Sequence, residues 1–321
     1  MVSDHIKMPW VSFCMSTYKR PVFLKQQLQI ILNQNFKDFE VVICDNDPEC
    51  SARSVVSLFD DIRLKYHPNY ENIGMIKSFN RSIGNSTAEY IVMITDDDPI
   101  VPDMLQIFHE LIKKFPGYGI YSGCSRKGKN ENTIEIFDNE NFLFQILNPE
   151  LTTNLLWSSC VIKKSVLLSI GKIPDYGSPH LADHAMLALC GTVNGGLIIN
   201  KMYSEIVSHE NNFSKGNIDL YFVACHQFFD LITKVGNKNF YEKNGNNILI
   251  KHLNRWFIVA IFSLRKYYTY SNKKNEIIKQ LDQETEKILA LDYMKQLRPR
   301  YYLKLLIFNI KRPLYQYKIL H

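Results

Sequence analysis

Short apolar runs alternate with amphipathic segments along the first hundred residues of the chain. The apolar runs lie at residues 10–15, 39–44, 62–67 and 90–94. Between them, apolar side chains recur at helical spacing, at residues 23–32, 52–59 and 75–83. Strands that alternate with helices are typical of a parallel sheet with right-handed crossovers. The pattern therefore predicts an α/β fold for this part of the chain.

One of these runs, Tyr90–Ile94, leads almost directly into three consecutive aspartates, 96, 97 and 98. A short, uncharged and β-branched run is typical of a strand that is buried on both faces. Parallel sheets bind their ligands beyond the carboxyl ends of the strands. Adjacent carboxylates there repel one another by about 4 kcal/mol per pair at close approach and an effective dielectric constant near 20. A divalent cation that also binds a substrate phosphate would relieve this repulsion.

Helix capping is the alternative explanation for these aspartates, because a helix is expected to begin near Pro102 and Asp103. Capping accounts for one aspartate but not for three. We therefore predict a site for a divalent cation such as Mg²⁺ and a phosphate group at this edge of the sheet.

Polar residues also follow the first two predicted strands. Thr17 and Tyr18 come after the first strand, and Asp45 comes after the second. Because the carboxyl ends of parallel strands lie at one edge, these residues should converge in one crevice with the aspartates. Tyr18 could stack on a base or could be a half-buried turn residue. Asp45 could accept a hydrogen bond from a base or a ribose, or could simply stabilise a turn.

Other features of the sequence exclude several classes of protein. The chain has no glycine-rich phosphate loop, which argues against dinucleotide oxidoreductases and P-loop kinases. Its 321 residues are 46% hydrophobic and 22% charged, as in an ordinary globular protein. Residues 1–7 do not resemble a signal peptide, and the seven cysteines form no Cys-x-x-Cys pair. We therefore expect reduced thiols and a cytoplasmic protein.

The last quarter of the chain is basic and rich in aromatic residues. Residues 240–321 contain 16 Lys or Arg and 6 Asp or Glu, whereas the whole chain has a net charge of only +6. Helical spacing is expected at residues 220–235, 248–268, 274–297 and 301–310. The uninterrupted apolar run 256–262 is too short to span a bilayer, which needs about 20 residues. Such helices lie in an anionic membrane interface or pack on a partner; alternatively they cap the catalytic domain. No nucleic-acid-binding motif is present, so no nucleic-acid partner is expected.

Taken together, these residues resemble the family 2 glycosyltransferases, the inverting GT-A enzymes that build bacterial polysaccharides. The resemblance is carried by segments 11–20, 32–41, 45–46 and 72–74, by Asn80, and by the strand that ends at residues 96–98. It implies a Rossmann-like, mainly parallel mixed sheet flanked by helices, with a helical extension after it. The implied cofactors are Mn²⁺ or Mg²⁺, and the implied donor is a nucleoside-diphosphate sugar, with a UDP-sugar preferred.

The resemblance also implies roles for individual residues of the donor site. Thr17, Tyr18 and Asp45 would hold the nucleoside, Asn72 would belong to the same site, and Lys77 would approach the phosphate or the base. Asp96 and Asp98 would form the Asp-x-Asp metal pair, with Asp98 the more direct ligand. Asp97 would lie near the sugar or the ribose.

In the second half the resemblance is looser. Asp183 matches the aspartate that acts as general base, and a helix N-cap is the alternative interpretation. Ala182 stands where the family usually has a glutamate, which weakens this motif. His209 matches a place where a histidine can complete the metal shell, although a lone histidine is more often a surface or core residue.

We therefore expect a GT-A catalytic domain at residues 1–238 and a basic helical region at 239–321. Residues 1–100 would bind the donor and 101–238 the acceptor. The enzyme would transfer a sugar to a hydroxyl of a glycan or a polyprenyl-diphosphate-linked acceptor, on the inner face of the cell membrane. The aromatic tail could equally serve a homodimer.

Two other functions stay open at this point. A sugar nucleotidyltransferase is disfavoured because residues 16–21 contain no glycine. The second alternative, a catalytically inactive scaffold protein with the same fold at the membrane, has only Ala182 in its favour.

Overall fold

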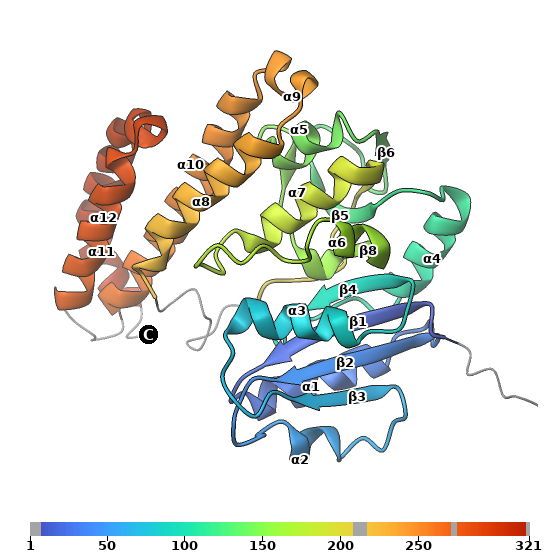
Figure 1. Ribbon diagram of the computed structural model, residues 1–321. Coiled ribbons are helices and arrows are strands. Elements are labelled where there is room, and N and C mark those ends of the chain that lie inside the picture. Colours follow the sequence, from blue (N-terminus) through green and yellow to red (C-terminus); the bar gives the residue numbers. More distant parts are fainter. Residues whose placement is uncertain (1–7, 208–216, 271–274, 319–321) are drawn as a thin grey trace, which may run out of the picture.

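A computed structural model describes residues 8–207, 217–270 and 275–318 (Figure 1). Its centre is one nine-stranded sheet, in the order β3-β2-β1-β4-β8-β5-β9-β6, with β7 paired to β5. The strands are β1 (Val11–Thr17), β2 (Phe39–Asp45), β3 (Leu64–Pro68), β4 (Tyr90–Ile94), β5 (Ile120–Arg126), β6 (Ile134–Phe137), β7 (Thr152–Thr153), β8 (Cys160–Lys163) and β9 (Gly196–Asn200).

Helices cover both faces of this sheet and continue beyond it. The α-helices are α1 (Pro21–Leu32), α2 (Arg53–Val56), α3 (Met75–Asn85), α4 (Met104–Lys114), α5 (Phe142–Leu147), α6 (Lys164–Ser169), α7 (Ala182–Asn194), α8 (Leu220–Val235), α9 (Lys238–Glu242), α10 (Gly245–Tyr270), α11 (Asn275–Ala290) and α12 (Arg298–Lys318). Two 3₁₀ helices, η1 (Trp157–Ser159) and η3 (Asp292–Leu297), complete the described elements used below.

The alternating pattern of the first hundred residues correctly predicted a parallel arrangement. β1 pairs in parallel with both β2 and β4, and β2 pairs in parallel with β3. β8 then pairs antiparallel with both β4 and β5, so the whole sheet is mixed. The register sets Thr17 opposite Asp45, which brings the carboxyl ends of β1 and β2 together.

Two expectations about helices were wrong. The segment 52–59 forms only the single turn α2, because the Leu58 and Phe59 N–H groups bond to carbonyls three residues back instead of four. The segment 274–297 does not form one helix. α11 ends at Ala290, the extended backbone of Leu291 interrupts it, and η3 follows.

Two apolar layers enclose the sheet. On β4, Ile91 and Met93 belong to one layer and Val92 and Ile94 to the other, so this strand is buried on both faces as predicted. The second layer lies under α1 and α4 and includes Leu28 and Phe108, among others.

The first layer continues into the C-terminal helices. Leu187 of α7 and Phe228 of α8 belong to the same apolar cluster as Phe257, Leu281 and Tyr301. In Figure 1, α8, α10, α11 and α12 stand side by side to the left of the sheet. The division into domains 1–238 and 239–321 stays a prediction. Within the described ranges, no helix is long and apolar enough to cross a membrane.

Candidate active site

The three aspartates lie at the carboxyl end of β4, beside the end of β1. The Thr17 hydroxyl donates a hydrogen bond to Asp96 Oδ2 at 2.8 Å. Helix α4 begins only at Met104, and its N-cap residue, Asp103, makes no side-chain capping bond. None of the three aspartates therefore caps this helix. Buried strands and an acidic edge thus meet where a parallel sheet binds its ligands.

Arg20, to which the sequence assigned no role, contacts two of these carboxylates. Its Nη1 donates to Asp96 Oδ1 at 2.6 Å, and its Nη2 donates to Asp97 Oδ2 at 2.5 Å. The aspartate side chains are 3% and 9% exposed, and that of Arg20 is 21% exposed. One guanidinium therefore neutralises part of the charge that crowds the end of β4. The only sequence signal for this was the position of Arg20 in the segment that follows β1.

The local environment disfavours the ionised forms of Asp96 and Asp98. Burial raises the pKa of Asp96 to about 6, although the charge of Arg20 and the Thr17 hydrogen bond oppose the rise. Burial also raises the pKa of Asp98 to about 6, and the negative charges of Asp97 and Asp183 contribute to the increase. The positive charge around the aspartates therefore does not fully compensate their negative charge. A further cation would favour their ionised forms.

The carboxylate and hydroxyl oxygens at this edge of the sheet are the kind of ligand that a hard divalent cation prefers. Ser158 Oγ of η1 lies 3.4 Å from Asp98 Oδ2 and 2.9 Å from Ser204 Oγ. Among the residues that the structure describes, no three His, Cys, Asp or Glu side chains are arranged to hold a metal ion. This is compatible with Mg²⁺, which commonly uses one or two carboxylates together with substrate phosphates. His209, predicted as a further ligand, lies outside the described residues.

Asp45 is fully buried at the end of β2 and organises the loop that follows. Its Oδ1 accepts from the Asp47 N–H at 3.0 Å, and its Oδ2 accepts from the Ala52 N–H at 3.0 Å and the Tyr66 hydroxyl at 2.9 Å. These contacts agree with the turn-stabilising interpretation. The contact of Asp45 with a nucleoside stays a prediction.

The other predicted donor residues surround the same edge but differ in exposure. Tyr18 is 43% exposed, so part of its ring is accessible, and Lys19 Nζ lies over the ring at 5.7 Å from the centroid. Asn72 Oδ1 accepts from Asn46 Nδ2 at 2.8 Å and from the Gly74 N–H at 3.0 Å, which fastens the loop before α3. Lys77 is exposed on α3. Their roles in donor binding are untested by these contacts.

Asp183 lies in the first turn of α7, where a carboxylate interacts favourably with the helix dipole. The N-cap is Leu181, so the expectation that Asp183 might be the N-cap is wrong. Leu181 is 2% exposed and has a φ of 63°, a strained conformation for a bulky residue. Such strain is typical of functional sites. The charge of Asp183 acts on Asp98, so the two carboxylates share one electrostatic environment.

Ala182, which departs from the family pattern, is 1% exposed and belongs to the apolar core. It therefore adds no polar group to the site.

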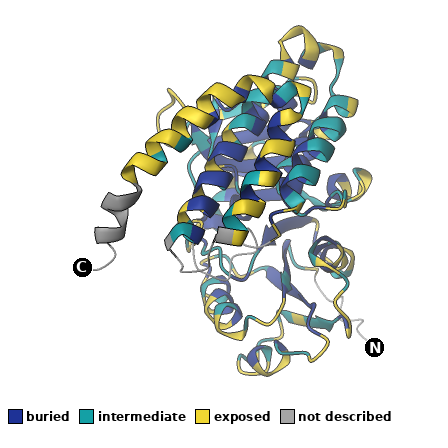
Figure 2. Ribbon diagram, turned by 90° about the vertical axis from the view of Figure 1, so that its left-hand side faces the viewer, coloured by how far each residue is buried: buried dark blue, intermediate teal, exposed yellow. Residues whose placement is uncertain are grey.

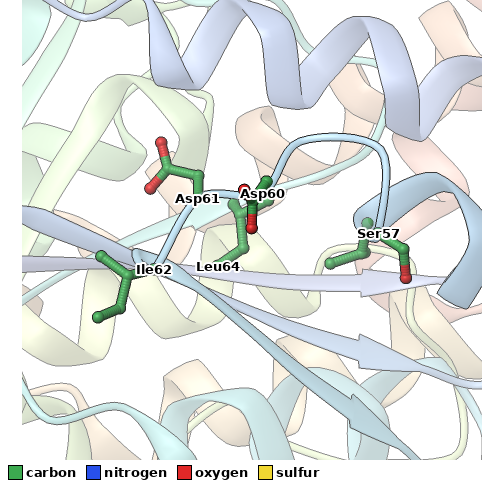
Figure 3. Close-up of a pocket in the computed structure, with 6 residues that line it drawn as sticks. Ser57, Asp60, Asp61, Ile62 and Leu64 are labelled. Carbon is green, nitrogen blue, oxygen red and sulfur yellow. The ribbon is translucent and has the colours of Figure 1, made fainter.

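A separate cavity of about 570 Å³ lies near the amino end of β3 (Figure 3). Ser57, Asp60, Asp61, Ile62 and Leu64 are among its lining residues. Asp61 is already paired with Arg63 at 2.6 Å. Because β3 runs parallel to β2, this cavity lies at the opposite edge of the sheet from the aspartates. It is therefore not part of the candidate site.

Comparisons with known proteins show what the sequence and the fold of this chain are similar to. Residues 12–166 match the model of glycosyl transferase family 2. The chain is 30% identical over 122 residues to a GalNAc(5)-diNAcBac-PP-undecaprenol beta-1,3-glucosyltransferase of Campylobacter jejuni, covering 36% of this chain and 38% of that protein. It is 26% identical over 181 residues to the abequosyltransferase RfbV of Salmonella typhimurium, covering 52% and 50%. These matches span about half or less of each relative.

Solved structures match over more of the chain. S. aureus TarS 1-349 superposes with a TM-score of 0.58 at 16% identity, over 92% of each chain. The mannosyltransferase PcManGT from Pyrobaculum calidifontis, in complex with GDP-Man and Mn²⁺, superposes with a TM-score of 0.53 at 15% identity, over 95% of this chain and 88% of that one. Identities this low show the fold alone. Residues 12–166 of this chain are therefore similar to glycosyl transferase family 2, within a mixed α/β fold of the GT-A type that carries additional C-terminal helices.

Proposed function

We propose that this protein transfers a sugar from a nucleoside-diphosphate sugar to a hydroxyl of a glycan or lipid-linked acceptor. The observation that carries the proposal is the clustering of Asp96, Asp97 and Asp98 beside Thr17, with Asp183 acting electrostatically on Asp98. The family match over residues 12–166 supports the reaction class. A polyprenyl-diphosphate-linked acceptor is favoured because two relatives, from Campylobacter jejuni and Escherichia coli, are named as acting on undecaprenol-diphosphate-linked sugars.

On the donor side, Asp96 and Asp98 would hold Mn²⁺ or Mg²⁺ together with the diphosphate. The bound cation would neutralise charge on the departing nucleoside diphosphate. Thr17, Tyr18, Asp45 and Asn72 would line the nucleoside site, and Lys77 would approach the phosphates. Structural neighbours were solved with UDP-GlcNAc and with GDP-Man and Mn²⁺, which supports a sugar nucleotide as donor without selecting its base. A UDP-sugar stays the preferred prediction.

On the acceptor side, Asp183 would take the proton from the attacking hydroxyl. Its half-buried position at the start of α7, behind the strained Leu181, would hold the carboxylate in one orientation. Attack on the face opposite to the leaving group would invert the configuration at the anomeric carbon. General-base assistance of this kind contributes a factor of about 10² to 10⁴ in rate.

A panel of UDP-, GDP- and dTDP-sugars tests the proposal. Each is incubated with the protein and Mn²⁺, and slow release of nucleoside diphosphate is measured, with Asp98→Ala as control. Hydrolysis of one donor by the wild type, and its loss in the variant, is expected. Release of pyrophosphate from a nucleoside triphosphate and a sugar phosphate would instead indicate a nucleotidyltransferase. If the protein neither binds a donor nor turns one over, the result favours the inactive scaffold.

The C-terminal region supports a second part of the proposal, attachment to the surface of an anionic membrane. Leu303, Leu306, Ile307 and Ile310 form a stripe at helical spacing on α12 and are 59%, 57%, 43% and 66% exposed. We call these four residues the α12 stripe. Figure 2 draws α12 as a largely exposed helix that extends away from the body. An exposed apolar face of this kind suits the interfacial zone of a bilayer.

Charge favours a lipid surface over a second copy of the chain. No Asp or Glu occurs after Asp292, whereas Arg298, Arg300, Lys304 and Lys311 lie on or beside the stripe. Two such faces would repel each other, whereas an anionic leaflet attracts each Lys or Arg by about 1 kcal/mol. Binding in the plane of the membrane would bring the active site to a lipid-linked acceptor. A homodimer through this face is the alternative outcome, and vesicle flotation together with sedimentation distinguishes it from membrane binding.

A further inference from the structure

We infer that Arg20, which contacts Asp96 and Asp97, is an internal counter-cation that competes with the divalent metal for Asp96, and that it moves to the donor diphosphate when the donor binds. The inference rests on the proposed function and adds a residue that neither the family resemblance nor the sequence pattern assigned. Its basis is the pair of short contacts from one guanidinium to two different carboxylates.

The contacts leave Asp96 engaged on both oxygens. Oδ1 accepts from Arg20 Nη1 at 2.6 Å, and Oδ2 accepts from the Thr17 hydroxyl at 2.8 Å. A metal bound by Asp96 needs lone pairs that face the ion, so it would have to displace or share the Arg20 contact. Arg20 therefore provides, in the absence of metal, the positive charge beside Asp96 that the metal ion would provide when bound.

Arg20 cannot release the carboxylates by losing its own charge. A guanidinium stays protonated at any physiological pH. It must therefore exchange one anionic partner for another. A diphosphate is a suitable second partner because a guanidinium binds carboxylate and phosphate oxygens with the same two-pronged geometry.

The position of Arg20 gives it room for this exchange. It is the residue before α1, it follows Lys19 with a positive φ of 54°, and its side chain keeps 21% of its surface exposed. The guanidinium also lies 4.7 Å from the Phe23 ring centroid, a contact that does not depend on the carboxylates. The side chain is thus attached at a loop and is only partly enclosed.

The electrostatic need for a counter-cation is also clear. Three aspartates lie at the end of β4, and the charge of Asp183 acts on one of them, Asp98. Leaving buried carboxylates without a cationic partner strongly destabilises a protein. Arg20 would stabilise the donor-free state and at the same time weaken the binding of metal alone, so that metal and donor bind best together.

The test measures Mn²⁺ binding without nucleotide, by titration of free Mn²⁺ with electron paramagnetic resonance. Arg20→Gln should bind Mn²⁺ about tenfold more tightly than the wild type, the effect of removing one charge-assisted competitor. The same variant should bind UDP in saturating Mn²⁺ about tenfold more weakly, because the diphosphate loses a partner. Arg20→Lys keeps the charge but loses the forked geometry. Its affinities for Mn²⁺ and for UDP should lie between those of the wild type and those of Arg20→Gln.

Lys19→Gln is the matched control. It removes the same charge one residue earlier, but Lys19 pairs with Asp47 at 3.9 Å and is 51% exposed. Its Mn²⁺ affinity should stay close to that of the wild type. Thermal unfolding with and without Mn²⁺ shows whether each variant is folded, and the stabilisation by Mn²⁺ should be larger for Arg20→Gln.

Three results would overturn the inference. They are unchanged or weaker Mn²⁺ binding by Arg20→Gln, an equal gain in Lys19→Gln, and undiminished UDP affinity in Arg20→Gln. If the wild type binds UDP with Mn²⁺ but one of these results is obtained, only the role of Arg20 fails. If neither wild type nor variants bind any nucleoside diphosphate with Mn²⁺, the proposed function itself fails.

Discussion

The donor-binding edge and the C-terminal helix α12 depart from the ordinary distribution of residues in opposite ways. At the edge, charged side chains are buried, and Asp96 is 3% exposed. On α12, apolar side chains are exposed, and Leu306 is 57% exposed. Buried charge and exposed apolar surface are both unusual in a folded protein and are therefore informative. The first indicates a ligand of opposite charge, and the second indicates an apolar surface that covers the stripe.

The two regions also differ in how they are held. Hydrogen bonds and ion pairs from Thr17 and Arg20 fix the aspartates, which is expected of a site that needs defined geometry. On α12, Tyr301 is buried in the core, but the α12 stripe is left to solvent. The following variants test each region separately, and each is paired with a control.

The largest effect is expected from Asp183→Asn. The change removes the proposed base but keeps the shape of the side chain, so transfer should fall about 10²- to 10⁴-fold while donor affinity is retained. Transfer rate and donor binding by calorimetry give the two readouts. Asp175→Asn, at a nearby exposed position, should behave as the wild type. Full transfer activity in Asp183→Asn would remove this residue from the role of base.

Asp98→Ala should abolish the part of donor binding that depends on metal. Loss of a ligand should weaken Mn²⁺-dependent donor affinity by about 100-fold or more, since even changes outside the ligand set cost 10- to 100-fold. Asp103→Ala is the control, because Asp103 is exposed and its side chain makes no capping bond. An unchanged donor titration with Mn²⁺ would contradict the assignment of Asp98.

Leu306→Glu tests the α12 stripe. The protein should float with vesicles that contain anionic lipid, and the variant should bind them about 10- to 100-fold more weakly, because burial of one leucine stabilises by about 1.5–3 kcal/mol. Leu58→Glu changes a leucine of similar exposure (67%) beside α2 and should have no effect. Absence of vesicle binding, together with a dimer in sedimentation that Leu306→Glu dissociates, would show that a second copy covers the stripe.

The smallest effect is expected in the pH dependence of stability. The pKa of Asp98 rises from 3.8 to about 6 on folding, so the folded state binds the proton more tightly than the unfolded state. In metal-free protein this group's contribution to stability should therefore fall as pH rises from about 4 to about 6.

Comparing the wild type with Asp98→Asn separates the pH dependence due to Asp98 from that due to the histidines. Burial lowers the pKa of His252 to about 3, so its contribution changes in the opposite direction. Urea unfolding of the wild type and of Asp98→Asn at pH 4.5 and 7 measures the difference. The variant should gain more stability relative to the wild type at pH 7 than at pH 4.5. Equal gains at both pH values would argue against the raised pKa.

The sequence predicted the strands of the donor half and the convergence of their polar ends. Buried strands can be recognised in the sequence as apolar runs. Because the carboxyl ends of parallel strands lie at one edge of the sheet, Thr17 and Asp96 were expected to be close together. It did not predict that α2 stops after one turn, because apolar spacing does not show that the backbone changes to bonds three residues back after Val56.

The sequence alone thus determined where the acidic residues stand along the chain, which family residues 12–166 resemble, and that the tail is basic. Only the tertiary structure decided which charges meet. Arg20 and Asp96 are 76 residues apart, and Asp183, on helix α7 in the second half of the chain, acts electrostatically on Asp98. No local pattern encodes such pairs, because the distance between two charges depends on how the strands are ordered and on where each loop turns.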